Sequence, residues 1–184
     1  TGLLWAFANH PQIIGIHGPV ITTLAAEPDW SIERLFKGIE TGFFDTLQGE
    51  GWGGNRVSGR LFPANLTVAT HLLGTPYQPD LTDTILAFED VNEDPYRLDR
   101  MLTYWRMVGG FKGVKGIALG RFSNCDVKGN NHSFTLEEVL RDRLGDLGIP
   151  IVSNLPFGHQ GSNPILPVGR VVNLDGEQGT LSWS

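Results

Sequence analysis

Residues 85–96 have the sequence ILAFEDVNEDPY, and this stretch decides the fold. The apolar run ILAF at residues 85–88 predicts a short buried strand, and the Asp-Pro pair at residues 94–95 predicts the start of a helix. A buried strand followed by a helix is typical of proteins in which the two elements alternate, so we expect an α/β fold. Acidic residues gather at the junction, and strand ends are where such folds place functional groups.

Apolar runs of strand length recur on both sides of this stretch. The chain has 24 glycines and 11 prolines, which argues against a helix bundle and favours short elements joined by tight turns. Ile13, Ile14 and Ile16 are expected in a buried strand. Further strands are expected at residues 57–62, 116–119, 149–152 and 169–174.

Helices are predicted from apolar spacing and from terminal signals. The apolar residues between Leu98 and Val108 recur on one helical face, and Gly109 and Gly110 end that helix. Thr135 with Glu138 three residues later is a capping box, in which each side chain pairs with a free backbone N–H at a helix start. Two shorter helices are expected at residues 3–9 and 65–73.

Composition and charge exclude several classes of function. Lys and Arg number 14 against 20 Asp and Glu, a net charge of −6, and no basic run offers a nucleic-acid footprint. No apolar stretch approaches the roughly 20 residues that a membrane span needs. The single cysteine, Cys125, cannot form an internal disulfide, which fits a reducing compartment, and we expect a cytoplasmic protein. The sequence begins at Thr1 without a signal peptide.

Two residues are the candidates for catalysis. Glu89 directly follows the buried run 85–88, and a carboxylate at the edge of an apolar element needs a partner. His159 lies among glycines on a loop, where catalytic side chains concentrate. A carboxylate and an imidazole together can orient and perform proton transfer for a nucleophile. Asp90, Glu93 and Asp94 are interpreted instead as acids that favour the positive end of the following helix.

Other polar residues give weaker signals. No spacing of His, Cys, Asp and Glu is typical of zinc, so no metal or cofactor is expected. The glycines at residues 51–54 lack the Lys-Ser/Thr of a phosphate loop. Trp52, in that loop, is interpreted as an exposed residue that stacks on a ligand or contacts another chain. His71 is expected to be structural, His10 to lie at a helix end, and His132 to lie in a polar loop.

Several motifs follow one another in order along nearly the whole chain, at residues 59–66, 73–77, 85–90, 96–100, 120–122 and 156–159. Together they resemble the LD-carboxypeptidase family, which includes muramoyl-tetrapeptide carboxypeptidases and microcin C self-immunity peptidases. The early His-Gly-Pro at residues 17–19 also fits that family. The chain departs from it at Pro63-Ala64, where the family usually has two glycines.

This resemblance implies a Ser-Glu-His triad, with Glu89 similar to the triad glutamate and His159 similar to the triad histidine. It implies a swivelling β/β/α C-terminal domain at residues 45–184, an interdomain connection at residues 21–44, and the tail of a Rossmann-like nucleophile domain at residues 1–20. The serine, at a Gly-x-Ser-Asp elbow, is expected upstream of Thr1, on an N-terminal fragment, so the chain alone should be inactive. The implied substrate is a murein tetrapeptide that loses its terminal D-alanine in peptidoglycan recycling, and the implied assembly is a homodimer.

Two alternatives remain open at this stage. Thr1 could itself be a nucleophile with its own α-amine as base, although the residues after it are predicted to form a helix rather than a strand. The chain could also be a non-catalytic binding or immunity module that keeps the fold without the serine.

Overall fold

The computed structural model describes residues 1–8, 10, 12–127 and 133–183. Within these residues no helix is both long and apolar enough to cross a membrane. The helices are α1 (Gly2–Phe7), α2 (Asp29–Thr41), α3 (Leu66–Leu72), α4 (Pro95–Met107), α5 (Leu136–Leu144) and the 3-10 helix η1 (Leu24–Ala26). The strands are β1 (Ile16–His17), β2 (Leu47–Gln48), β3 (Glu50–Gly51), β4 (Val57–Asn65), β5 (Thr84–Val91), β6 (Gly116–Ser123), β7 (Ile151–Ser153), β8 (Leu166–Pro167), β9 (Val171–Asp175) and β10 (Thr180–Trp183).

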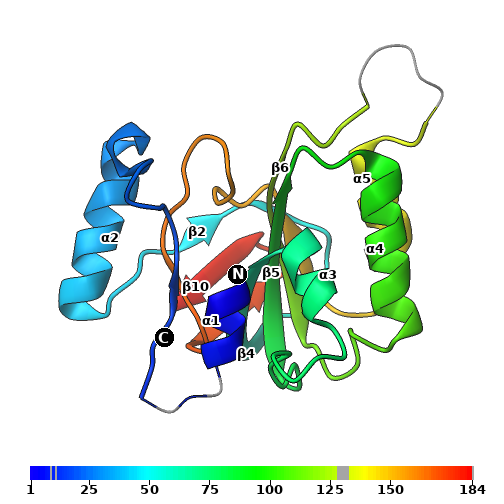
Figure 1. The fold of residues 1–184 in the computed structure, drawn as a ribbon, viewed down its shortest axis with the longest axis horizontal. Coiled ribbons are helices and arrows are strands. Elements are labelled where there is room, and N and C mark those ends of the chain that lie inside the picture. The colour runs from blue at the N-terminus through cyan, green and yellow to red at the C-terminus, as the bar shows by residue number, and fades with distance from the viewer. Residues whose placement is uncertain (9, 11, 128–132, 184) are drawn as a thin grey trace.

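A mixed sheet forms the centre of the molecule (Figure 1). In the described residues its strand order is β2-β10-β9-β4-β5-β6-β7-β3, and β4 to β7 run parallel to one another. The flanking strands pair antiparallel. The strands at its two ends, β2 and β3, are separated along the chain only by Gly49, so the sheet must curl round on itself. The expected α/β class is confirmed.

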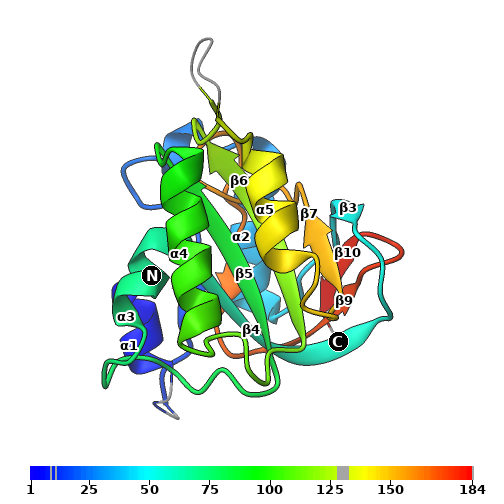
Figure 2. The ribbon, with the colours of Figure 1, turned by 90° about the vertical axis from the view of Figure 1, so that its right-hand side faces the viewer.

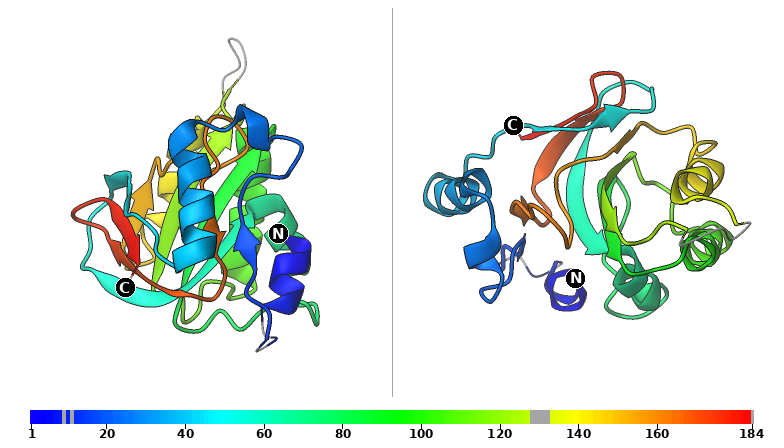
Figure 3. Two further views of the ribbon diagram at one scale, coloured as in Figure 1. Left: turned by 90° about the vertical axis from the view of Figure 1, so that its left-hand side faces the viewer. Right: turned by 90° about the horizontal axis from the view of Figure 1, so that it is seen from above.

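Helices cover the two faces of the sheet unequally. α3, α4 and α5 lie over one face, and α2 lies on the opposite side (Figures 2 and 3). Side chains of β5 alternate between two cores, as a strand requires. Leu86 and Phe88 join the core under the helices, whereas Ile85 and Ala87 join the core on the other face.

The helix signals in the sequence are confirmed. Pro95 occupies the first turn of α4, and Gly109, with φ of +72°, follows its end. Thr135 and Glu138 form the predicted capping box of α5. Asn65 caps α3 by accepting a hydrogen bond from the backbone N–H of Val68.

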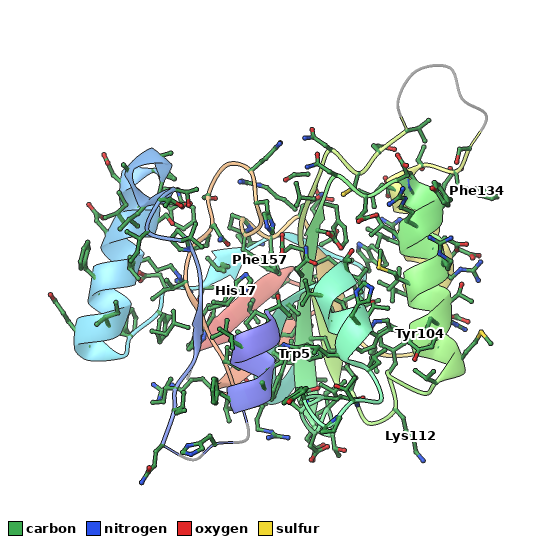
Figure 4. The ribbon with its side chains drawn as sticks, in the orientation of Figure 1. Trp5, His17, Tyr104, Lys112, Phe134 and Phe157 are labelled. Atoms are coloured by element: carbon green, nitrogen blue, oxygen red, sulfur yellow. The ribbon has the colours of Figure 1, made fainter. Side chains whose placement is uncertain are left out.

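Helix α1 is held to the sheet by Trp5, which is fully buried (Figure 4). Its indole N–H donates to the carbonyl of Pro63 at 3.1 Å, and its ring meets Phe62 and Trp105 edge to face. Proline is tolerated at position 63 because the β4–β9 ladder ends at Arg60, so that edge of β4 does not need an N–H from residue 63.

The expectation of a buried strand at Ile13, Ile14 and Ile16 is wrong. Only Ile16–His17 is a strand, and it pairs with β8 outside the main sheet. The ladder between β1 and β8 is only two residues long and does not include Ile14. The side chain of Ile14 is therefore left 69% exposed.

Residues 21–44, expected as a connection, contain the 13-residue helix α2. Its anchor is Arg34, which is 3% exposed and stacks over Trp183 at 4.5 Å. The guanidinium donates to the carbonyls of Ile165 and Asp45. Burial lowers the pKa of Arg34 to about 10. The domain boundaries at residues 20 and 45 stay a prediction, but α2 contacts the main domain through this arginine.

Replacing Arg34 by alanine is expected to destabilise the chain by roughly 2–3 kcal/mol, because two carbonyls lose a donor and the rings of Trp183 and Phe44 lose a packing partner. Chemical denaturation with tryptophan fluorescence measures the free energy of unfolding. Lys37→Ala is the matched control, since Lys37 pairs with Asp45 on the surface and should contribute no more than about 1 kcal/mol. Equal effects of the two changes would contradict the anchoring role.

Candidate active site

Glu89 is placed by the alternation of β5. It follows Phe88, which points toward the helices, so Glu89 points toward the opposite face. Its neighbour Asp90 points back toward α3. Both carboxylates are buried, with 1% and 2% exposure, so each requires compensation from nearby polar groups.

His159 lies on the loop between β7 and β8, and glycines shape that loop. Gly158 has φ of +145°, and a Cβ there would lie 2.8 Å from the carbonyl oxygen of Arg121. Gly161 has φ of +84°, and a Cβ there would lie 2.2 Å from the guanidinium of the same arginine. A side chain at position 158 would therefore displace the loop from β6, whereas one at position 161 would be strained by its positive φ and would shift the guanidinium of Arg121.

Strand β6 fixes the loop in return. The backbone N–H of Arg121 donates to the carbonyl of Phe157 at 2.7 Å. Its side chain donates to the carbonyl of Gln160 at 3.1 Å and to the hydroxyl of Ser162 at 3.3 Å. Arg121 thus holds the loop by hydrogen bonds on both sides of His159 in the sequence.

The two predicted residues meet. Nδ1 of His159 lies 2.6 Å from Oε2 of Glu89, whose side chain is 1% exposed, whereas the imidazole is 52% exposed. Both residues line a cavity of about 1080 Å³. A carboxylate on Nδ1 fixes the tautomer in which Nε2 is free to accept a proton from a group in the cavity.

Electrostatics at Glu89 are balanced between burial and pairing. Burial raises the pKa of Glu89 above its ordinary 4.5, and the hydrogen bond from His159 opposes that rise. Its second oxygen, Oε1, is buried and has no hydrogen-bond partner among the described residues. The carboxylate is therefore compensated mainly through one oxygen, and its raised pKa marks Glu89 as a candidate functional group.

Asp90 has a different role from the one expected. It does not support the start of α4; its oxygens accept from the side chain of Asn65 at 2.8 Å and from the N–H and hydroxyl of Thr67 at 2.9 and 2.8 Å. The interpretation as an acid at the α4 terminus is wrong, because strand alternation turns Asp90 toward α3. Asp94 does lie at the N-cap of α4, although its side chain makes no capping hydrogen bond.

Further residues complete the cavity, and of these the sequence did not single out Glu27 or Asn163. His17, on β1 (Figure 4), lines it together with Thr1, Glu27 and Asn163. Burial above all lowers the pKa of His17, and the nearby His159 adds to this effect. At neutral pH His17 therefore presents an uncharged imidazole. No local pattern could have brought these residues together, since they are distant in sequence.

Trp52 is not the exposed residue that was expected. Its indole N–H donates to the hydroxyl of Ser153 at 2.8 Å, and the guanidinium of Arg141 lies 4.6 Å from its ring centre. His132 lies outside the described residues. Among the described residues no three His, Cys, Asp or Glu side chains group as metal ligands, and the expected lack of a metal site stays a prediction.

Comparison with known proteins identifies the family. Residues 58–174 match the model of the LD-carboxypeptidase C-terminal domain. The chain belongs to the LD-carboxypeptidase family. Both Glu89 and His159 fall within the residues that match this domain.

Relatives of this LD-carboxypeptidase chain also carry carboxypeptidase names. A protein of Synechocystis sp. with a provisional carboxypeptidase name is 55% identical over 183 residues, covering 100% of this chain and 60% of the relative. The murein tetrapeptide carboxypeptidase of Pseudomonas aeruginosa is 32% identical over 199 residues, covering 98% of this chain and 61% of the relative. The chain thus spans about 60% of the length of these relatives.

Solved structures extend the likeness. The muramoyltetrapeptide carboxypeptidase from Oxalobacter formigenes superposes with a TM-score of 0.85 at 28% identity, covering 97% of this chain and 63% of that protein. The protein MccF in complex with glutamyl sulfamoyl guanosine superposes with a TM-score of 0.80 at 18% identity, covering 100% of this chain and 64% of that protein, which shows a shared fold.

Neutralising Glu89 and neutralising Asp90 should have opposite effects on the stability of the chain at pH 7. Glu89 has a folded pKa above the unfolded value, so its contribution to stability is full below pH 4.5 and is lost as pH rises through the folded pKa. Glu89→Gln should therefore melt no lower than the parent at pH 7, and its advantage should shrink as pH falls toward 4. Thermal melts of the purified parent chain and of Glu89→Gln between pH 7 and pH 4 measure this difference in melting temperature.

Asp90→Asn is the matched control. It replaces a carboxylate that accepts hydrogen bonds from Asn65, Thr67 and the backbone N–H of Val91, so it should cost roughly 1–3 kcal/mol at pH 7. A Glu89→Gln protein that melts lower than the parent, by an amount independent of pH, would contradict the raised pKa of Glu89.

Proposed function

We propose that Glu89 and His159 are the carboxylate and the imidazole of a Ser-Glu-His triad in a serine-type LD-carboxypeptidase. The observation that carries this proposal is the 2.6 Å contact between Nδ1 of His159 and the buried Oε2 of Glu89, beside a large cavity. The carboxylate holds the tautomer and stabilises the imidazolium, and the imidazole performs the proton transfers.

The chemistry follows from that division of roles. A serine oxygen attacks the carbonyl carbon of the scissile peptide bond, and Nε2 of His159 takes the serine proton. His159 then gives that proton to the departing amine of D-alanine, and the C–N bond breaks. A water molecule repeats the sequence on the acyl-enzyme and releases the shortened peptide. The mechanism requires no metal or cofactor.

The serine is proposed to come from sequence upstream of Thr1, in a Rossmann-like domain. Support comes from Thr1 itself, which lines the same cavity as Glu89 and His159. A residue shortly before Thr1 would therefore enter the cavity beside the imidazole. Residues 1–20 would then be the tail of that domain, residues 21–44 the connection and residues 45–184 the C-terminal domain.

The proposed substrate is a murein tetrapeptide that loses its terminal D-alanine after a lysine or diaminopimelate residue. Support comes from the relatives whose names state activity on murein or muramoyl tetrapeptides. We further propose that the complete enzyme works in the cytoplasm in peptidoglycan recycling and assembles as a homodimer.

Thr1 as an N-terminal nucleophile is a second candidate. The observation that favours it is the position of Thr1 in the cavity, where burial lowers the pKa of its amine, opposed by Glu89. Two observations argue against it. The hydroxyl of Thr1 accepts a hydrogen bond from the N–H of Asn65 at 2.7 Å, and Thr1 directly precedes helix α1, as a structural residue would.

In the complete enzyme, His159→Ala should lower kcat by at least ~10²–10⁴, since the proton acceptor is gone. Glu89→Gln should lower kcat by about 10⁴, by analogy with the Asp→Asn change in serine proteases, because it can hold the wrong tautomer. KM should change little in both, as neither residue binds the ground-state substrate. D-alanine release from a murein tetrapeptide measures both constants.

His71→Ala, at an exposed histidine on α3, is the control and should leave kcat and KM unchanged. A folded His159→Ala enzyme with near-normal turnover would refute the triad.

The isolated 184-residue chain should show no turnover of the same peptide, because the proposed serine lies elsewhere. Thr1→Ala in the complete enzyme should keep most of kcat. Turnover by the isolated chain that Thr1→Ala abolishes would instead establish Thr1 as the nucleophile. A complete enzyme that binds the peptide without cleaving it would indicate a binding or immunity module.

A further inference from the structure

The cavity is lined by acidic side chains without basic Arg or Lys partners among the described residues. Among the described residues that line it there is no Arg or Lys, and its charged side chains are the carboxylates Glu27 and Glu89 beside the two histidines. Glu89 is committed to His159. Glu27 is therefore the carboxylate that remains available to a ligand in this cavity.

Glu27 is held in a fixed position. It follows η1 and lies just before α2, and its side chain is half-buried. Its Oε2 accepts from the hydroxyl of Ser31 at 2.7 Å and from the backbone N–H of Asn163 at 2.9 Å. These are uncharged donors, and within the described part of the chain no Lys, Arg or His forms an ion pair with Glu27. A carboxylate oriented in this way has acceptor capacity left for a cation.

Glu27 is also close to the catalytic loop. The side-chain oxygen of Asn163 accepts from the N–H of Gly158 at 3.4 Å, and Gly158 precedes His159. Asn163 thus links the carboxylate of Glu27 to the backbone beside the imidazole through two hydrogen bonds. A group bound at Glu27 would lie in the same cavity as the imidazole of His159.

We propose that Glu27 is a specificity residue that binds a primary ammonium group of the substrate, the side-chain amine of the residue on the amino side of the scissile bond. The inference rests on the proposed function, because that residue is the lysine or diaminopimelate of the tetrapeptide. An ammonium is a compact charge with three donors, and it is complementary to a carboxylate that lacks a cation. A half-buried pair of this kind is screened less than a surface pair.

A structural role for Glu27 is the competing explanation, since Asn163 and Ser31 both depend on it. Glu27→Gln separates the two roles. The amide oxygen of glutamine can still accept from Ser31 and Asn163, whereas the negative charge is lost. Glu40→Gln is the matched control, because it removes the same charge from an exposed position on α2.

The experiment uses the complete enzyme and two tetrapeptides that differ only at the third residue, lysine or norleucine. Norleucine keeps the aliphatic chain and lacks the ammonium. Glu27→Gln should lower kcat/KM about ten-fold for the lysine peptide, through KM, and less than about two-fold for the norleucine peptide. Glu40→Gln should change neither peptide by more than about two-fold. Equal losses on both peptides, or no loss on either, would overturn the inference.

A binding measurement keeps this result separate from the proposed function. Calorimetry of the lysine and norleucine tripeptide products against the same variants requires no turnover. If the enzyme cleaves neither tetrapeptide but binds the lysine tripeptide in a manner that depends on Glu27, the inference stands and the proposed function fails. If it cleaves both tetrapeptides while binding is independent of Glu27, the proposed function stands and the inference is overturned.

Discussion

Burial of the carboxylate of Glu89 is the constraint on which the rest of the site depends. An ionised carboxylate at 1% exposure is unfavourable unless a donor compensates it, and here the donor is the imidazole of His159 at 2.6 Å. The imidazole can be there only because its loop approaches β6 closely. Glycines at positions 158 and 161 and the two-sided grip of Arg121 make that approach possible.

The end of β5 carries two consecutive buried carboxylates that have different partners. Alternation along the strand sends Glu89 to the cavity and Asp90 to the start of α3, where donors from Asn65 and Thr67 satisfy it. One carboxylate pairs with the imidazole of His159, and the other accepts hydrogen bonds at the start of a helix. Identical charge at adjacent positions thus has different roles, because the two faces of a strand meet different environments.

The cavity gathers segments that lie far apart in the chain. Thr1 and His17 come from the first 20 residues, Glu27 precedes α2, and Glu89 and His159 come from the main domain. Asn163 links Glu27 to the loop of the histidine, so the residues proposed for substrate binding and for proton transfer are mechanically connected. Arg34, by docking α2 on Trp183, keeps that connection in place.

The sequence by itself determined the local elements and singled out Glu89 and His159 as the candidate pair. The apolar run at residues 85–88, the capping box at Thr135 and the glycines after α4 are local signals, and each depends on neighbours within a few residues. Motif resemblance pointed to Glu89 and His159. The tertiary structure alone decided that Asp90 belongs to α3, that Trp52 packs against Ser153 and Arg141, that Ile14 is uncovered, and that Glu27 and His17 share a cavity with the pair. The physical reason is that burial and hydrogen-bond partners depend on which segments the sheet brings together, and pairings between distant segments leave no periodic trace in the chain.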